Sequence, residues 1–257
     1  MSHPVFAYIK FLLKSKNQYG VHSPFVFDYL TKGLANSEVK IPKNILQYRK
    51  ALRNNHAQIE ITDFGAGSKV FKDNKRIVSQ LATTAGISSK RGELLFKTLN
   101  YFKPKTILEI GTSMGIATTY MAGYSDVTKV YTLEGCPEIA GLAKKHLYEF
   151  GFNNIEILVG EFGETLPIVL KNKKFDFIYF DGNHQKEPTI AYFEECLEAA
   201  HEDSVFIFDD IHWTSSMEEA WEFIKNHKSV TISIDSFKWG MVFFRKGQVK
   251  EHFTLRI

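Results

Sequence analysis

The sequence predicts an α/β fold: a doubly wound, Rossmann-like parallel sheet that follows a helical N-terminal extension. From residue 105 onward, short apolar runs alternate five times with amphipathic segments, as strands and helices do in a parallel sheet. The apolar runs are almost continuous, as expected of strands covered by helices on both faces. After the fifth repeat, two more apolar runs follow without a helix between them, which predicts an adjacent antiparallel pair.

Residues 1–60 are predicted to form helices joined by turns. VFAYIKFLLK places its apolar residues on one helical face, SPFVFDYLTKGL begins with Ser-Pro and ends near Gly33, and IPKNILQYRKALRNNH continues the pattern. A further helix, GELLFKTLNYF, ends before Pro104. These elements divide the chain into a helical extension or cap over residues 1–90 and a sheet-bearing domain over residues 91–257.

The five strand–helix units occupy residues 106–227. In chain order, the predicted units are TILEIG with MGIATTYMAGY, KVYTLEG with PEIAGLAKKHLYEFG, IEILVGE with ETLPIVLKNKK, FDFIYFDG with EPTIAYFEECLEAA, and SVFIFDD with SMEEAWEFIKNH. Such a series predicts right-handed crossovers between parallel strands. The two strands predicted to close the sheet are SVTISIDSF and KWGMVFFRKG.

Composition excludes several classes of protein. The chain has 257 residues and a mean hydropathy of −0.19, and charges break its apolar stretches before the roughly 20 residues that a bilayer requires. The apolar run near the N-terminus has its lysines within or after it, unlike a secretory signal. Cys136 and Cys196 cannot build a disulfide framework or a zinc ribbon. We therefore expect a soluble, cytoplasmic protein with no membrane partner.

The net charge of +3 conceals an uneven distribution. Residues 1–105 carry 18 Lys and Arg against 6 Asp and Glu, and residues 106–257 carry 14 against 23. The two parts could attract each other and dock, which we favour because the lysines are scattered. The alternative is an anionic partner such as nucleic acid, although no aromatic-basic RNA-binding motif, helix-turn-helix or zinc knuckle supports it.

A second segment has some features of a ligand-binding turn. IEITDFGAGS, at residues 59–68, also has the pattern of a strand, an acid and a glycine turn, but no apolar strand ending in an acid follows it before residue 107. We favour a surface loop with an Asx-type turn, and the alternative is a lid near the ligand.

Carboxylates follow the predicted strands, one strand after another. They are Glu109, Glu134, Glu161, Asp181, Asp209 and Asp210. Since the carboxyl ends of parallel strands meet at one edge of the sheet, where open α/β sheets bind ligands, these acids mark a site. Like charges gathered at one edge repel each other unless a cation or a hydroxyl-rich ligand joins them.

The turn after the first strand indicates the class of ligand. In Gly111–Gly115, Ser113 stands where a dinucleotide-binding motif has its second glycine, and Glu109 adds negative charge just before the turn. These features disfavour a nicotinamide dinucleotide and suit a cationic ammonium group. Glu134 follows Glu109 by 25 residues, where an acid can accept both ribose hydroxyls. A ligand with a ribose, a cationic amino-acid end and no phosphate is S-adenosylmethionine.

ILEIGTSMGIATTYMA resembles the E/D-x-G-x-x-x-G loop of class I S-adenosylmethionine-dependent methyltransferases, and residues 88–245 are most similar to the catechol O-methyltransferase-like group. The resemblance implies a seven-stranded sheet whose last strand is antiparallel, O-methylation of a small hydroxylated acceptor, and a possible homodimer. The alternative is an RNA methyltransferase or a nucleic-acid-binding protein on the same fold. The cofactor-binding residues expected on these grounds are Glu109, Gly111, Thr112, Ser113, Gly115, Glu134, Gly160, Glu161, Phe162 and Asp181.

The resemblance also implies a divalent metal such as Mg²⁺, held by Asp181, Asp209 and Asp210. Asp210 departs from the family, which usually has Asn there. The alternative is that no metal binds and the acids orient the substrate. His184 stands where the family has a general-base lysine, so Asp181 and His184 are the candidate catalytic residues; a histidine here could equally be a loop hydrogen-bonding residue. His212 and Trp213 either line the acceptor pocket or, in the case of Trp213, cap the core.

Overall fold

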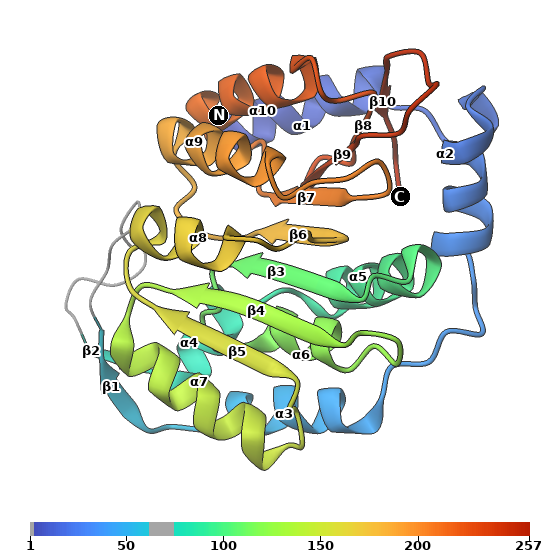
Figure 1. Ribbon diagram of the computed structural model, residues 1–257. Coiled ribbons are helices and arrows are strands. Elements are labelled where there is room, and N and C mark those ends of the chain that lie inside the picture. Colours follow the sequence, from blue (N-terminus) through green and yellow to red (C-terminus); the bar gives the residue numbers. More distant parts are fainter. Residues whose placement is uncertain (1–2, 62–74) are drawn as a thin grey trace.

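The computed structural model describes residues 3–61 and 75–257, and its centre is an eight-stranded sheet of order β10-β8-β9-β7-β6-β3-β4-β5 (Figure 1). The strands are β3 (Thr106–Ile110), β4 (Lys129–Glu134), β5 (Ile155–Val159), β6 (Phe177–Phe180), β7 (Val205–Asp209), β8 (Ile232–Asp235), β9 (Trp239–Phe243) and β10 (Glu251–Thr254). Strands β3 to β7 are parallel, and β9 runs antiparallel to both β7 and β8. The predicted doubly wound sheet of seven strands with an antiparallel seventh strand, β9, is confirmed.

Strand β10 is an addition that the sequence analysis did not predict. It pairs in parallel with β8, and Leu255 just beyond it forms a bridge with Lys16. The strand reads EHFT, four residues in which no apolar run stands out. Its pairing therefore depends on the exposed edge of β8 rather than on a local hydrophobic pattern.

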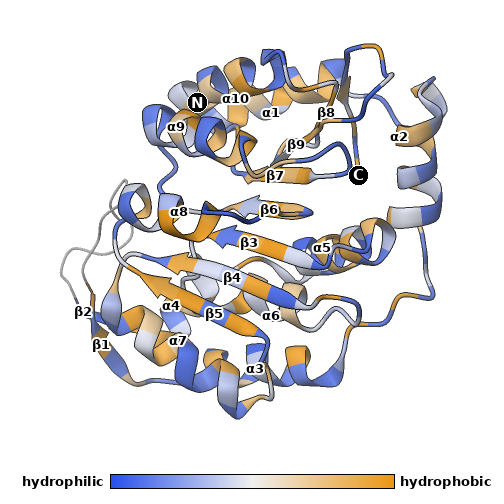
Figure 2. Cartoon of the chain, viewed as in Figure 1, coloured by the Kyte–Doolittle hydropathy of each residue, from blue (hydrophilic) through white to orange (hydrophobic). Residues whose placement is uncertain are grey.

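Helices from the part of the chain after residue 88 lie on both faces of the sheet. They are α5 (Ser89–Phe102), α6 (Ile116–Ala122), α7 (Pro137–Glu149), α8 (Phe162–Leu170), α9 (Lys186–Leu197) and α10 (Ser215–Asn226). Successive side chains of a strand point to opposite faces. Accordingly, Ile107 packs in one hydrophobic cluster with α5, α6 and α7, and Leu108 packs in another with α8, α9 and α10. Figure 2 shows hydrophobic residues along the central strands and both kinds of residue along the helices.

The N-terminal part contains α1 (His3–Lys14), the short helix η1 (Gln18–Gly20), α2 (Pro24–Asp28), the π-helix η2 (Tyr29–Leu34), α3 (Lys43–Arg53) and α4 (Val78–Thr84). The strands β1 (Gln58–Glu60) and β2 (Lys75–Ile77) form a separate antiparallel pair. The glycine turn of the segment 59–68 lies outside the described residues. Among the described residues, no helix is both long and apolar enough to cross a membrane.

The N-terminal helices share the core of the sheet. Tyr29 and Tyr48 are fully buried in the same hydrophobic cluster as Ile107. The hydroxyl of Tyr29 forms a 2.8 Å hydrogen bond with that of Thr98, and the hydroxyl of Tyr48 donates to the carbonyl of Met114 at 2.7 Å. Helix α3 thus directly supports the turn between β3 and α6.

Candidate active site at the carboxyl edge of the sheet

The turn after β3 joins the carboxyl ends of three strands. The backbone N–H groups of Gly111 and Thr112 both donate to Leu133 O on β4 at 3.0 Å. Gly111 has a φ of +106°, and a Cβ atom placed on it would lie 2.5 Å from the carbonyl oxygen of Asp181, which follows β6. Only glycine allows this conformation and this close approach together. The predicted turn therefore lies against both neighbouring strands.

Glu134, at the end of β4, is held by this turn. Its Oε2 accepts a hydrogen bond from the backbone N–H of Ser113 at 2.8 Å, and its Oε1 accepts one from that of Cys136 at 3.0 Å. Burial raises the pKa of Glu134, while these N–H groups act to lower it. Two backbone donors thus fix the orientation of the carboxylate, which has further lone pairs for a ligand.

Glu109 lies deeper than the sequence suggested. It is fully buried, and its Oε2 accepts hydrogen bonds from the hydroxyls of Thr118 and Thr132, both at 2.6 Å. Its Oε1 is buried without a partner among the described residues. Burial raises the pKa of Glu109 to about 8, although the hydrogen bonds from the two threonine hydroxyls act to lower it. The carboxyl therefore keeps its proton in the folded protein at neutral pH.

This shift predicts a pH-dependent stability. In the unfolded chain Glu109 ionises near its ordinary pKa of 4.5, so the folded state binds more protons between that pH and about 8. Stability is lost as the pH rises through this window, by up to on the order of 5 kcal/mol at ~1.4 kcal/mol per pKa unit. We expect Glu109→Gln to remove this loss. The free energies of unfolding in urea should therefore be equal for the variant and the wild type at pH 4.5, and at pH 8.5 the variant should be the more stable of the two. Glu149→Gln, an exposed acid on α7, is the control, and equal pH profiles for wild type and Glu109→Gln would contradict the assignment.

Gly160 lies beside Glu134, and Glu161 and Phe162 follow it in the chain. The N–H of Gly160 donates to the carbonyl of Glu134 at 3.0 Å, and Glu161 is the N-cap of α8. The Phe162 ring lies so close to Gly182 that a Cβ there would be 2.6 Å from it. These residues connect the end of β5 to the end of β6.

Asp181 directly follows β6 and Asp209 is the last residue of β7. The two strands are neighbours in the sheet, since Phe180 of β6 pairs with Phe208 of β7. Burial, and then the neighbouring Asp209, raises the pKa of Asp181 well above that of an ordinary aspartate. Nε2 of His184 lies 3.8 Å from Oδ1 of Asp181. The structure thus brings together Asp181, His184 and Asp209.

Arg91 is the residue of this site that the sequence analysis missed. Its Nη1 lies 2.6 Å from Oδ1 and 2.8 Å from Oδ2 of Asp209. Burial acts to lower the pKa of Arg91, but Asp209, together with Tyr179, Asp210 and Asp181, outweighs burial and the pKa is raised. The one local signal is a cation in the first turn of α5, where the helix dipole disfavours positive charge.

Asp210 has a different partner. Its Oδ1 lies 3.1 Å from the Nζ of Lys238, and its backbone has a positive φ of +51°. His212 also forms ion pairs, with Nδ1 2.7 Å from Glu218 Oε1 and Nε2 3.0 Å from Asp235 Oδ2. Both ring nitrogens of His212 are therefore occupied, which favours a structural role over lining an acceptor pocket. Trp213 is 42% exposed and so does not cap the core.

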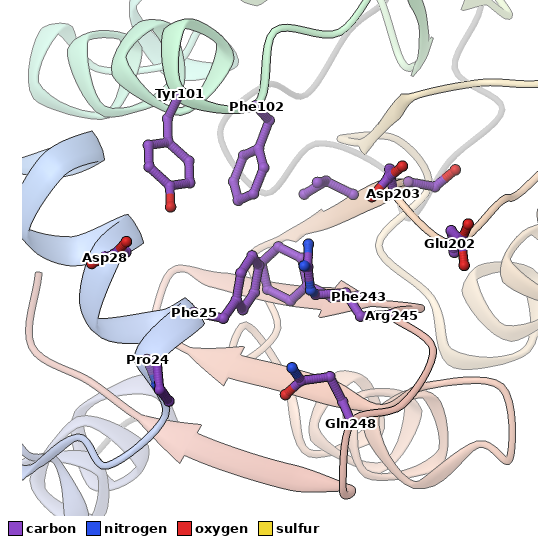
Figure 3. A pocket seen from close by; sticks show the side chains of 12 residues that line it. Pro24, Phe25, Asp28, Tyr101, Phe102, Glu202, Asp203, Phe243, Arg245 and Gln248 are labelled. Atoms are coloured by element: carbon purple, nitrogen blue, oxygen red, sulfur yellow. The ribbon is translucent and has the colours of Figure 1, made fainter.

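A separate cleft of about 670 Å³ lies at the opposite edge of the sheet (Figure 3). Its walls include Val205, the first residue of β7, and Phe243, the last residue of the antiparallel β9. The guanidinium of Arg245 lies 4.5 Å from the centre of the Phe25 ring. This cleft is remote from the carboxyl edge and contains none of the predicted site residues.

The sheet order, the glycine turn and the acid at the end of β4 define the Rossmann-like class I methyltransferase fold. Residues 108–211 match the family "Methyltransferase domain". A catechol O-methyltransferase of Mycobacterium tuberculosis is 30% identical over 127 residues, which is 49% of this chain and 56% of that protein. A protein-L-isoaspartate O-methyltransferase of Protochlamydia amoebophila is 42% identical over 55 residues, 21% of this chain and 25% of that protein.

Solved structures share the fold at low sequence identity. The methyltransferase PaMTH1 of Podospora anserina, bound to S-adenosylhomocysteine (SAH), has a TM-score of 0.62 and 14% identity. The match covers 88% of this chain and 98% of that one. An O-methyltransferase of Bacillus cereus, in complex with SAH, has a TM-score of 0.56 and 22% identity. The match covers 83% of this chain and 97% of that one.

The chain therefore contains a segment that matches a methyltransferase domain, is similar in sequence to a catechol O-methyltransferase over about half of its length, and shares the fold of solved O-methyltransferases. The match to the mycobacterial relative spans little more than half of that protein's length.

Proposed function

We propose that the chain is an S-adenosylmethionine-dependent O-methyltransferase acting on a small hydroxylated acceptor. The observation that carries the proposal is the Glu134 carboxylate, which the N–H groups of Ser113 and Cys136 hold beside the glycine turn. Charge-assisted hydrogen bonds from two ribose hydroxyls to this carboxylate would stabilise the complex by roughly 1.5–3 kcal/mol each. Two structural neighbours bind S-adenosylhomocysteine, the product of such a reaction, which supports the same ligand here.

The remaining contacts to the cofactor follow the turn. Gly111, Thr112, Ser113 and Gly115 would lie along the methionine end. Glu109, buried and protonated beneath them, would support the turn and would carry no charge opposite the ammonium group. Gly160, Glu161 and Phe162 would lie by the adenine. Asp181 would lie near the methyl group, because its backbone adjoins the turn at Gly111.

The chemistry is a displacement at the sulfonium methyl group. An oxygen lone pair of the acceptor forms the new C–O bond, the C–S bond breaks, and sulfur keeps the electron pair. The hydroxyl proton of the acceptor goes to a base, for which His184 beside Asp181 is our candidate, because a neutral imidazole can accept a proton near pH 7. The protein otherwise contributes alignment of the two reactants.

A divalent metal does not fit the side-chain contacts of this site. Both oxygens of Asp209 accept hydrogen bonds from Arg91, and Oδ1 of Asp210 is paired with Lys238. Within residues 3–61 and 75–257, no group of three or more His, Cys, Asp or Glu side chains is arranged to hold a metal ion. We therefore derive no step of the reaction through a metal.

The extension over residues 1–90 would act as a cap that shapes the acceptor site, supported by the hydrogen bond from Tyr48 on α3 to the glycine turn. The domain division at residue 91 and the homodimer stay predictions. The comparisons add no support for the RNA alternative.

Transfer of a labelled methyl group tests the proposed function. We expect the purified protein to transfer label from S-adenosylmethionine to at least one member of a panel of catechols and other small phenols. His184→Ala should lower the rate at least about tenfold while leaving cofactor affinity within a few-fold, since general-base catalysis typically contributes 10²–10⁴ in rate. Asp181→Asn should lower both the rate and the cofactor affinity, because Asp181 is proposed to contact the cofactor as well. Transfer to RNA and to none of the phenols would contradict the proposal.

A further inference from the structure

The ion pair of Arg91 and Asp209 joins residues 118 positions apart in the sequence. The side chain of Asp209 is 5% exposed and that of Arg91 is 24% exposed. The carboxylate is thus enclosed, whereas part of the arginine side chain still faces the surroundings at the carboxyl edge. Among the described residues, Nη1 is the only guanidinium nitrogen of Arg91 with a hydrogen-bond acceptor.

This pair uses the atoms that a divalent cation would need. Mg²⁺ binds carboxylate oxygens at 2.0–2.1 Å and neutralises their charge. Nη1 of Arg91 already contacts both oxygens of Asp209, and its charge balances that of the carboxylate. Lys238 provides a second protein cation, at Asp210. A divalent cation at Asp209 would lie beside the positive charge of Arg91 and be repelled by it, so tight binding requires that Arg91 be displaced.

The position of Arg91 on α5 makes a nearby carboxylate favourable. Arg91 lies in the first turn of the helix, and its backbone N–H donates to the N-cap Ser88 Oγ at 3.3 Å. A positive charge here is repelled by the amino end of the helix dipole. The neighbouring carboxylate offsets that repulsion, so Arg91 and Asp209 stabilise each other's charged forms.

We propose that Arg91 replaces the divalent cation of related sites, so that its guanidinium is the positive charge facing the acceptor oxygen during methyl transfer. The acceptor would then be a hydroxyl compound whose oxygen carries negative charge as its proton leaves for the base. The claim that Arg91 takes the place of the cation concerns only residues of this chain and does not depend on the proposed function. The claim that Arg91 faces the acceptor oxygen rests on that function.

Binding of Mn²⁺, followed by electron paramagnetic resonance, tests the replacement without any acceptor. We expect wild-type protein to show no saturable Mn²⁺ site. Arg91→Met, which removes the cation and keeps much of the apolar stem, should gain one saturable Mn²⁺ site per chain. The double variant Arg91→Met with Asp209→Asn should lose that site. Lys97→Met removes a cation from the same helix, where it pairs with Glu93 at 2.9 Å, and should gain no Mn²⁺ site.

The wild-type titration decides the matter even if Arg91→Met folds poorly. One saturable Mn²⁺ per wild-type chain, abolished by Asp209→Asn, would overturn the proposal. A thermal-denaturation series adds a second measurement, in which Mn²⁺ should raise the midpoint of Arg91→Met and leave that of wild type unchanged. Calorimetric titration with S-adenosylhomocysteine separates the two claims, because failure to bind it would refute the proposed function and leave the Mn²⁺ result intact.

Discussion

Replacing Gly111 by alanine is expected to destabilise the folded protein by at least about 3 kcal/mol. The residue has a φ of +106°, and a Cβ atom would lie 2.5 Å from the oxygen and 2.8 Å from the carbon of the Asp181 carbonyl. The backbone conformation alone costs a residue with a side chain roughly 1–2 kcal/mol. The clash is with backbone atoms, so relief requires the turn to move away from the end of β6. Urea denaturation of wild type and Gly111→Ala measures the loss.

Gly141→Ala is the matched control for this experiment. Gly141 lies within α7, and a Cβ there would meet no heavy atom within 4 Å. Since alanine is the better helix former, this change should stabilise the protein by about 0.5–1 kcal/mol. Opposite signs for the two glycines are the expected result. Equal stability of Gly111→Ala and wild type would show that the turn does not lie against β6 as described.

Replacing Glu134 by alanine is expected to weaken S-adenosylmethionine binding at least about 100-fold. The variant loses two charge-assisted hydrogen bonds to the ribose, roughly 1.5–3 kcal/mol each, and ~1.4 kcal/mol corresponds to a tenfold change in affinity. It also leaves the N–H groups of Ser113 and Cys136 without their acceptor, which loosens the turn. Isothermal titration calorimetry measures the affinity, and circular dichroism checks that the variant is folded.

Glu149→Ala serves as the control for Glu134→Ala. Glu149 is an exposed acid at the end of α7, 4.0 Å from Lys145, and its loss should leave affinity unchanged. Glu134→Gln should fall between wild type and alanine, because it keeps one acceptor and loses the charge. Wild-type affinity in Glu134→Ala would remove the main support for the proposed function.

The central sheet could be predicted because its signal is local. Each of β3 to β7 is a short apolar run followed by an amphipathic segment, so the order of parallel strands and helices was readable residue by residue. Strand β10 has no such run, and only the edge of β8 makes it a strand.

The site could be predicted in outline, since strand ends locate the acids. The depth of Glu109 could not, because it depends on two threonines, from α6 and β4, that enclose the carboxyl. Arg91 was beyond sequence reasoning for a related reason: its partner Asp209 is distant in the chain, and only the packed fold brings the two together. This pair does link the basic N-terminal part to the acidic remainder, in line with the docking interpretation of the charge distribution.

Calorimetric titration of S-adenosylmethionine into the purified protein tests the central claim most directly, since the whole account depends on a cofactor site at the carboxyl edge. We predict saturable one-site binding in the micromolar range in wild type, unchanged by a chelator and lost in Glu134→Ala. Absence of saturable binding by the wild-type protein, or binding that Glu134→Ala retains in full, would contradict the account.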